Sequence, residues 1–130
     1  MVNIAILGFG TVGSGVAEVL TRNGGLIDGR VNNQVRLKYI MRARDIFEGP
    51  YKDLFVKDFS IIERDPEVSI VVETIGGTRF AYPYVKACLE SGRSVCTSNK
   101  EMVATYGAEL LALAKAHNLS LIHISEPTRP

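Results

Sequence analysis

The sequence predicts an α/β fold in which a parallel sheet is doubly wound, with helices on both of its faces. Apolar runs of strand length alternate with stretches that carry apolar residues at helical spacing, and this alternation is typical of parallel sheets. The runs are almost continuous, which suits strands that are buried on both faces. Composition agrees with one globular domain, because 46% of the 130 residues are hydrophobic and 22% are charged.

The first half of the chain alternates as this fold requires. A strand is expected at 2–7, followed by a helix that ends at Asn23-Gly24-Gly25 and carries the apolar stripe Val12, Val16, Val19 and Leu20. After a loop to residue 33, a second strand is expected at 35–41. A loop with at most short structure at 42–57, a short helix around 59–62 and a strand at 68–73 complete this half. The short helix stops near Asp65-Pro66, since the residue before a proline disfavours helical backbone.

The second half repeats the alternation. Its expected elements are a break at Gly76-Gly77, a helix at 79–91, a strand at 94–97, a helix at 99–117 and a strand at 119–124. Pro83 is tolerated only in the first turn of a helix, so the helix over 79–91 should begin near 80–82. Five parallel strands are therefore expected, with their carboxyl ends along one edge, where ligands bind in open sheets.

A glycine-rich turn follows the first strand. Gly8-Phe9-Gly10-Thr11-Val12-Gly13 matches G-x-G-x-x-G at the junction of a predicted strand and a predicted helix. In this context Gly8 makes the tight turn, Gly10 lets a pyrophosphate approach the backbone, and Gly13 lets the helix pack close to the strand. The helix N-terminus offers amide donors to the phosphates. Residues 8–13 are thus predicted to bind a dinucleotide in a Rossmann-type domain.

The end of the second strand bears on which dinucleotide is bound. A carboxylate there binds the ribose of NAD, whereas an arginine accommodates the additional phosphate of NADP. Arg42 and Arg44 come first after this strand, and Asp45 follows them. Asp28 lies in the loop before the strand and is discounted. The order favours NADP or the use of both cofactors, and NADP or NAD is the cofactor expected.

Two further segments lie at carboxyl ends of strands and are candidate site residues. They contribute Thr74, Ile75, Gly76 and Gly77 after the third long strand, and Thr97, Ser98 and Asn99 after the next. Gly76-Gly77 would let the ribose on the nicotinamide side approach the backbone. Asn99 would cap the following helix, with Lys100 just inside it. A cation at a helix N-terminus is electrostatically unfavourable, which hints at a functional reason for Lys100.

The motifs GFGTVGSGV, ETIGG and TSNKEMVA together resemble the N-terminal NAD(P)-binding domain of homoserine dehydrogenase, over residues 2 to about 121. The resemblance implies NAD(P)-dependent interconversion of homoserine and aspartate semialdehyde, in the biosynthesis of threonine and methionine. It also implies that Lys100 is catalytic, beside nicotinamide and substrate, while Glu73 fits the family pattern. Ser98 stands where the family usually has alanine, a small change.

The resemblance also sets expectations for domain organisation. Residues 1–121 are expected to form the NAD(P)-binding domain. Residues 122–130, with the sequence IHISEPTRP, are expected to be a non-native or disordered tail. The family's substrate and dimerisation domain is expected to be missing. The chain should therefore bind cofactor without oxidising homoserine, and the full-length enzyme should bind this small-molecule substrate as a homo-oligomer.

Charge and composition narrow the partners. A net charge of +1 offers no strong field for nucleic acid or a membrane surface, and no apolar run reaches the roughly 20 residues of a membrane span. No secretory signal is expected, and Cys88 and Cys96 lack metal-ligand spacing. A cytoplasmic protein with reduced cysteines and no metal site is therefore expected.

Three alternatives to a separate homoserine dehydrogenase domain stay open. They are a non-catalytic NAD(P)-sensing module, another two-domain amino-acid dehydrogenase, and a homoserine dehydrogenase fused to aspartate kinase. Met1 directly before the first strand argues against the fusion.

Overall fold

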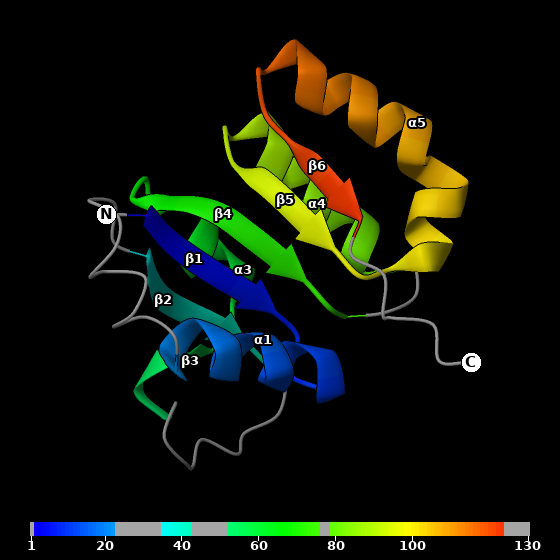
Figure 1. Ribbon diagram of the computed structural model, residues 1–130. Helices are drawn as coiled ribbons and strands as arrows, with labels where there is room; N and C mark the ends of the chain where they lie inside the picture. The colour runs from blue at the N-terminus through cyan, green and yellow to red at the C-terminus, as the bar shows by residue number, and fades with distance from the viewer. Residues whose placement is uncertain (1, 23–34, 43–51, 76–78, 124–130) are drawn as a thin grey trace.

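The sheet is parallel throughout the part of the chain that the computed structural model describes, residues 2–22, 35–42, 52–75 and 79–123 (Figure 1). Its strands are β1 (Val2–Leu7), β2 (Val35–Met41), β3 (Phe55–Val56), β4 (Val68–Glu73), β5 (Ser94–Thr97) and β6 (Leu121–His123). Their order is β3-β2-β1-β4-β5-β6. The chain thus winds outward in both directions from β1 and β4, which confirms the doubly wound Rossmann-type fold.

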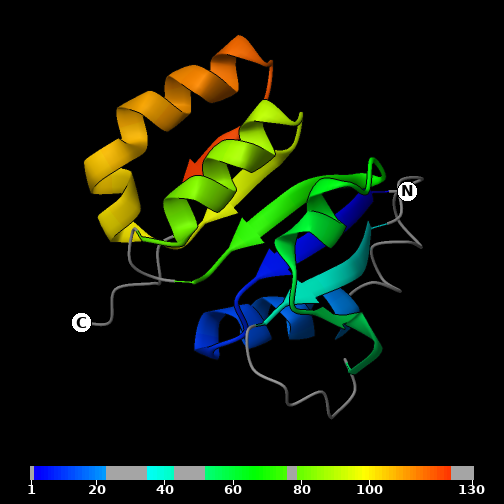
Figure 2. The same cartoon turned by 180° about the vertical axis from the view of Figure 1, so that it is seen from behind.

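Helices cover both faces of this sheet. They are α1 (Thr11–Arg22), the 3-10 turn η1 (Lys52–Leu54), α3 (Phe59–Glu63), α4 (Ala81–Glu90) and α5 (Lys100–Ala116). Figure 1 shows α1 in front of β1 and β2, and Figure 2, seen from behind, shows α3 and α4 against the opposite face. The helix over 79–91 begins at residue 81, so Pro83 falls in its first turn as predicted.

Two apolar clusters hold the layers together. On the face of α1, Ile4, Ile6 and Ile40 pack with Ala17 of that helix. On the other face, the larger cluster joins the sheet to α3, α4 and α5 through Ala5, Leu7, Ile62, Val71, Val85, Leu89, Val95, Met102 and Leu110. Both faces of the central strands are therefore buried, as their continuous apolar runs predict.

An irregularity in the register between β1 and β2 changes which side chains of β2 face each of the two apolar clusters. The pairing of β1 with β2 passes from Ile4–Leu37 to Ala5–Tyr39, which leaves Lys38 as an extra residue in β2. An extra residue re-aims the side chains that follow it. Leu37 and Ile40 consequently share one face although they are three residues apart.

Two features differ from the sequence-based expectation. The two-residue strand β3 pairs with the end of β2, so the described part of the sheet has six strands instead of five. The last strand spans Leu121–His123 instead of 119–124, and its Ile122 and His123 pair with β5. The predicted loop around 23–33 and the stop at Asn23-Gly24-Gly25 lie outside the described residues.

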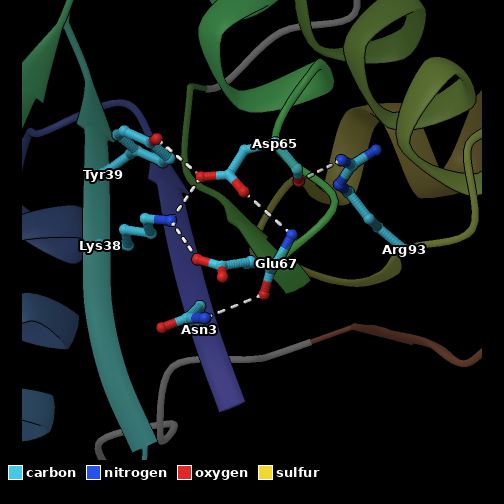
Figure 3. A network of polar contacts seen from close by, with 6 residues as sticks. All are labelled: Asn3, Lys38, Tyr39, Asp65, Glu67 and Arg93. Atoms are coloured by element: carbon cyan, nitrogen blue, oxygen red, sulfur yellow. Dashed lines mark hydrogen bonds and ion pairs between the residues drawn. The ribbon is translucent and has the colours of Figure 1, made fainter. Parts of the chain in front are cut away.

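A polar cluster, which we call the Asp65 cluster, ties β1 and β2 to the segments that lead into β4 and β5 (Figure 3). It consists of Asn3, Lys38, Tyr39, Asp65, Glu67 and Arg93. The Asp65 carboxylate pairs with Lys38 Nζ at 2.6 Å and accepts a hydrogen bond of 2.7 Å from the Tyr39 hydroxyl. These partners lower the pKa of Asp65 to about 2. The Arg93 guanidinium donates to the Asp65 carbonyl at 2.5 Å.

Candidate functional site

A pocket of about 550 Å³ opens where the strand order reverses, at the carboxyl ends of β1, β2 and β4. Its lining residues are Gly8, Phe9, Gly10, Met41, Arg42, Thr74, Ile75, Phe80 and Tyr84. Six of the predicted cofactor residues therefore meet there: Gly8, Phe9, Gly10, Arg42, Thr74 and Ile75. Open α/β sheets bind ligands at this position, because the crossovers on the two sides diverge and leave a crevice.

The turn between β1 and α1 has the geometry that the glycine motif predicts. Gly8 has a φ of +94°, a conformation that side chains rarely adopt, and its amide donates to the Met41 carbonyl at 2.9 Å. The hydroxyl of Thr74 donates to the carbonyls of Leu7 and Gly8, at 3.0 and 3.1 Å. A Cβ at residue 13 would lie 2.8 Å from Thr74 Oγ1. Gly13 thus permits the close packing of α1 on this turn.

Gly10 differs from its neighbours because the space beside it is open. A Cβ built on Gly10 meets nothing within 4 Å, and Gly10 is exposed on the pocket wall. Directly after it begins α1, a twelve-residue helix whose first amides have no partner within the helix. Bare backbone beside a positive helix end fits the pyrophosphate of a dinucleotide. The residues present therefore fit the group that the motif implies.

Arg42 is the first residue after β2 and lines the same pocket. Its guanidinium carbon lies 5.8 Å from the ring centroid of Phe9 and 5.7 Å from that of Phe55. Both distances fall within the range of a cation–π interaction. Arg44, the second arginine of the predicted pair, lies outside the described residues, as do Gly76 and Gly77.

A buried hydrogen-bond network joins the ends of β4 and β5. The carboxylate of Glu73, which is fully buried, accepts from the Ile75 amide at 2.8 Å and from the Thr97 hydroxyl at 2.6 Å. Thr97 Oγ1 accepts in turn from the Asn99 amide at 3.0 Å. Glu73 therefore holds the two predicted segments in fixed relation, which is a structural role for this carboxylate.

Thr97, Ser98 and Asn99 do not line the pocket among the described residues. The Thr97 hydroxyl faces Glu73, and the side chain of Asn99 caps α5 by accepting from the Met102 amide at 3.0 Å, as predicted. Contact of these three residues with cofactor stays a prediction. Thr11 and Val12 lie in the first turn of α1, beside the pocket residue Gly10.

Lys100 is the first residue of α5, directly after the capping Asn99, and it is exposed. Its position at the carboxyl edge of the sheet follows from the end of β5 at Thr97 (Figure 1). The structure thus leaves the ammonium group accessible at the edge where the pocket lies. Its catalytic role stays a prediction.

Three pocket residues escape the sequence analysis: Met41, Phe80 and Tyr84. Phe80 is 57% exposed, with the Arg79 guanidinium 5.2 Å from its ring, and the Tyr84 ring packs 4.7 Å from that of Phe59. The sequence predicts a helix at 79–91 but does not show that α4 begins beside the pocket. Only the crossover from β4 brings this helix there.

Other kinds of site find no support in the part of the chain that the structure describes. No group of three or more His, Cys, Asp or Glu side chains could hold a metal ion among these residues. No helix among them has the length and apolar character needed to cross a bilayer. Cys88 and Cys96 are both free thiols, the first buried and the second half-buried.

Comparison with known families gives a match over most of the chain. Residues 8–123 match the family described as homoserine dehydrogenase, NAD binding domain. The homoserine dehydrogenase of Lactococcus lactis is 36% identical over 127 residues, which are 94% of this chain and 30% of that protein. The enzyme of Corynebacterium glutamicum is 41% identical over 124 residues, 92% of this chain and 27% of that protein.

Solved structures give the same result for the fold. The crystal structure of Staphylococcus aureus homoserine dehydrogenase superposes with a TM-score of 0.87 at 29% identity, over 95% of this chain and 33% of that one. That of the Thiobacillus denitrificans enzyme gives a TM-score of 0.82 at 31% identity, over 94% and 29%. The chain thus spans about 30% of the length of the curated relatives that it matches.

Proposed function

Because the chain belongs to the family of homoserine dehydrogenase NAD-binding domains, we propose that its pocket holds the dinucleotide with the pyrophosphate on the turn from Gly8 to Gly13. The observation that carries the proposal is the open space beside Gly10, which a pyrophosphate would fill without displacing any side chain. The N-terminus of α1 adds amide donors and a positive potential.

The adenosine end of the ligand is proposed to lie toward β2. Among the described residues that line the pocket, Arg42 carries a positive charge on that wall. A guanidinium at this position pairs with a 2′-phosphate in two parallel hydrogen bonds. The proposal is therefore preference for NADP, or use of both cofactors. Met41, Ile75 and Phe80 supply an apolar wall for the adenine ring.

In a full-length enzyme, this domain would serve the interconversion of homoserine and aspartate semialdehyde. The nicotinamide supplies or takes up the hydride when it is bound. What the chain itself contributes is position and a proton: Lys100, at the carboxyl edge, would hold a proton for the aldehyde oxygen as that oxygen becomes a hydroxyl. The remaining catalytic groups would come from a substrate domain, so this chain should bind cofactor without turnover.

Further expectations belong to the same proposal and are supported only by the family relationship. They are a role in threonine and methionine biosynthesis, a cytoplasmic location, a homo-oligomeric full-length enzyme, and partners limited to small molecules, with no nucleic acid and no membrane.

Isothermal titration of the chain with NADPH and NADH in parallel tests the proposed site. Gly10→Ala should weaken both nucleotides at least tenfold, because its methyl group would stand in the pyrophosphate position, a loss of about 1.4 kcal/mol or more. Gly15→Ala is the matched control: it lies in the same helix, its Cβ also meets nothing within 4 Å, and it does not line the pocket. Equal affinities for these two variants would contradict the proposal.

A further inference from the structure

We propose that Phe55, together with Phe9, fixes the guanidinium of Arg42 at the pocket wall and thereby sets how strongly the site prefers a 2′-phosphorylated adenosine over an unphosphorylated one. This inference rests on the proposed dinucleotide site and adds a residue that positions one of its groups.

The three side chains form one compact contact. The rings of Phe9 and Phe55 meet edge to face, with centroids 5.1 Å apart and planes at 85°. The guanidinium carbon of Arg42 lies nearly equidistant from both, at 5.8 and 5.7 Å. Two aromatic rings that share one cation restrict it more than either would alone.

The backbone brings Phe55 to this place. In the register of β2 with β3, Ile40 pairs with Phe55 and Met41 with Val56. The amide of Arg42 then donates to the Val56 carbonyl at 2.9 Å, beyond the end of β2. The short strand β3 therefore anchors both the main chain and the side chain of Arg42.

The pocket distinguishes the two phenylalanines. Phe9 and Arg42 line it, whereas Phe55 is not among its described lining residues. Phe55 thus acts through Arg42 and is a positioning residue. An aromatic contact occupies the face of a guanidinium and leaves the N–H donors at its edge directed outward, which suits a phosphate.

The order that the two rings impose on Arg42 determines how much tighter the 2′-phosphate binds. A free arginine side chain loses rotamer entropy when it binds a phosphate, and a side chain that is already ordered loses less. Cation–π contacts at partly exposed sites are strong enough to change the dissociation constant of a phosphate bound by the arginine about threefold to tenfold. The effect should fall on the 2′-phosphate alone, because the ligands NADPH and NADH differ only there.

The experiment compares dissociation constants of NADPH and NADH for the chain and its variants, by calorimetry. Phe55→Leu removes the ring and should lower the ratio of the NADH dissociation constant to the NADPH dissociation constant about threefold to tenfold, with NADH binding changed less than twofold. Phe55→Tyr keeps an aromatic ring and should retain the ratio. Leu54→Ala is the matched control, since Leu54 packs in the same apolar cluster without touching the Arg42 guanidinium through a ring.

A spectroscopic readout separates positioning from simple destabilisation. The ³¹P resonance of the 2′-phosphate in bound NADP should titrate at lower pH in the wild-type chain than in Phe55→Leu, because a nearby fixed cation favours the dianion. If Phe55→Leu fails to fold, Phe9→Leu removes the other ring and should lower the same ratio.

Each contrary outcome has a distinct meaning. Equal weakening of NADPH and NADH by Phe55→Leu, with Arg42→Ala lowering the ratio, overturns this inference and leaves the proposed site intact. A wild-type ratio near one, or no effect of Arg42→Ala, overturns the inference through its dependence on Arg42. Absence of binding by either nucleotide would overturn the proposed function as well.

Discussion

The carbonyl oxygen of Gly8 lies within 3.0 Å of the position that a Cβ of residue 13 would occupy. Real Cβ atoms essentially never approach another atom so closely, and the crowding atom belongs to the backbone, which cannot rotate away. The end of β1 and the first turn of α1 therefore meet with no room for a methyl group.

Alanine scanning of the two glycines inside α1 should separate packing from helix propensity. Gly13→Ala should destabilise the chain by about 2–3 kcal/mol, because the added methyl group must push α1 away from the turn. Gly15→Ala, which meets open space, should stabilise it by up to about 1 kcal/mol. Urea denaturation followed by circular dichroism measures both. The same midpoint for both variants would contradict the crowding at residue 13.

The buried network at Glu73 predicts a difference between two changes at Thr97. Thr97→Val keeps the shape but leaves a carboxylate oxygen and the Asn99 amide without this partner, at a cost of about 3 kcal/mol. Thr97→Ser keeps the hydroxyl and loses one buried methyl group, about 1 kcal/mol. Denaturation midpoints test the order, and a serine variant as unstable as the valine variant would contradict it.

The Asp65 cluster predicts acid sensitivity. The pKa of Asp65 is lowered from 3.8 to about 2 in the folded chain, so as pH falls the unfolded chain takes up its proton first. The stabilisation is thus complete above about pH 5 and is lost between about pH 5 and pH 2. Asp65→Asn should cost about 1 kcal/mol at pH 7, and the difference from wild type should vanish toward pH 2.

Glu67 provides the control for this measurement. It also pairs with Lys38, at 2.9 Å, but its side chain is 70% exposed. Glu67→Gln should therefore change stability less than Asp65→Asn at pH 7. A gap between Asp65→Asn and wild type that stays constant from pH 7 to pH 2 would refute the assigned pKa.

The two thiols should react at different rates. Cys88 is 1% exposed, and burial raises the pKa of its thiol to about 12, whereas Cys96 is only half-buried. Iodoacetamide at pH 8, with mass spectrometry of peptides, should label Cys96 first and Cys88 only after unfolding. In 6 M guanidinium both should label equally, and faster labelling of Cys88 in the folded chain would be inconsistent with its burial.

Much of the fold could be predicted because its information is local. The long strands β1, β2 and β4 are continuous apolar runs, and the turn after β1 has its own glycine pattern. β3 could not be predicted, since two residues, Phe55 and Val56, carry no periodicity. They form a strand only because β2 offers a free edge beside them.

Some residues of the candidate site can also be identified from the sequence, whereas others can be identified only from the structure. Gly8, Gly10 and Arg42 are marked by type and by position at strand ends, so sequence reasoning finds them. Phe55 and Phe80 are marked by neither, because their importance comes from what lies next to them in space. Thr97 has a role that its strand-end position does not reveal: its hydroxyl donates to the buried Glu73 carboxylate.

The extra residue in β2 has a consequence for how this domain could change over generations. Lys38 stands where the register slips, and its charge is neutralised by Asp65 and Glu67 on the side of the sheet away from the glycine turn. Along β1, Asn3 and Leu7 are separated by about 13 Å, so the Asp65 cluster and the glycine turn lie at opposite ends of the strand. Substitutions around Asn3 therefore make no direct contact with the nucleotide end, so selection could change the stability and the ligand preference of this domain as separate traits.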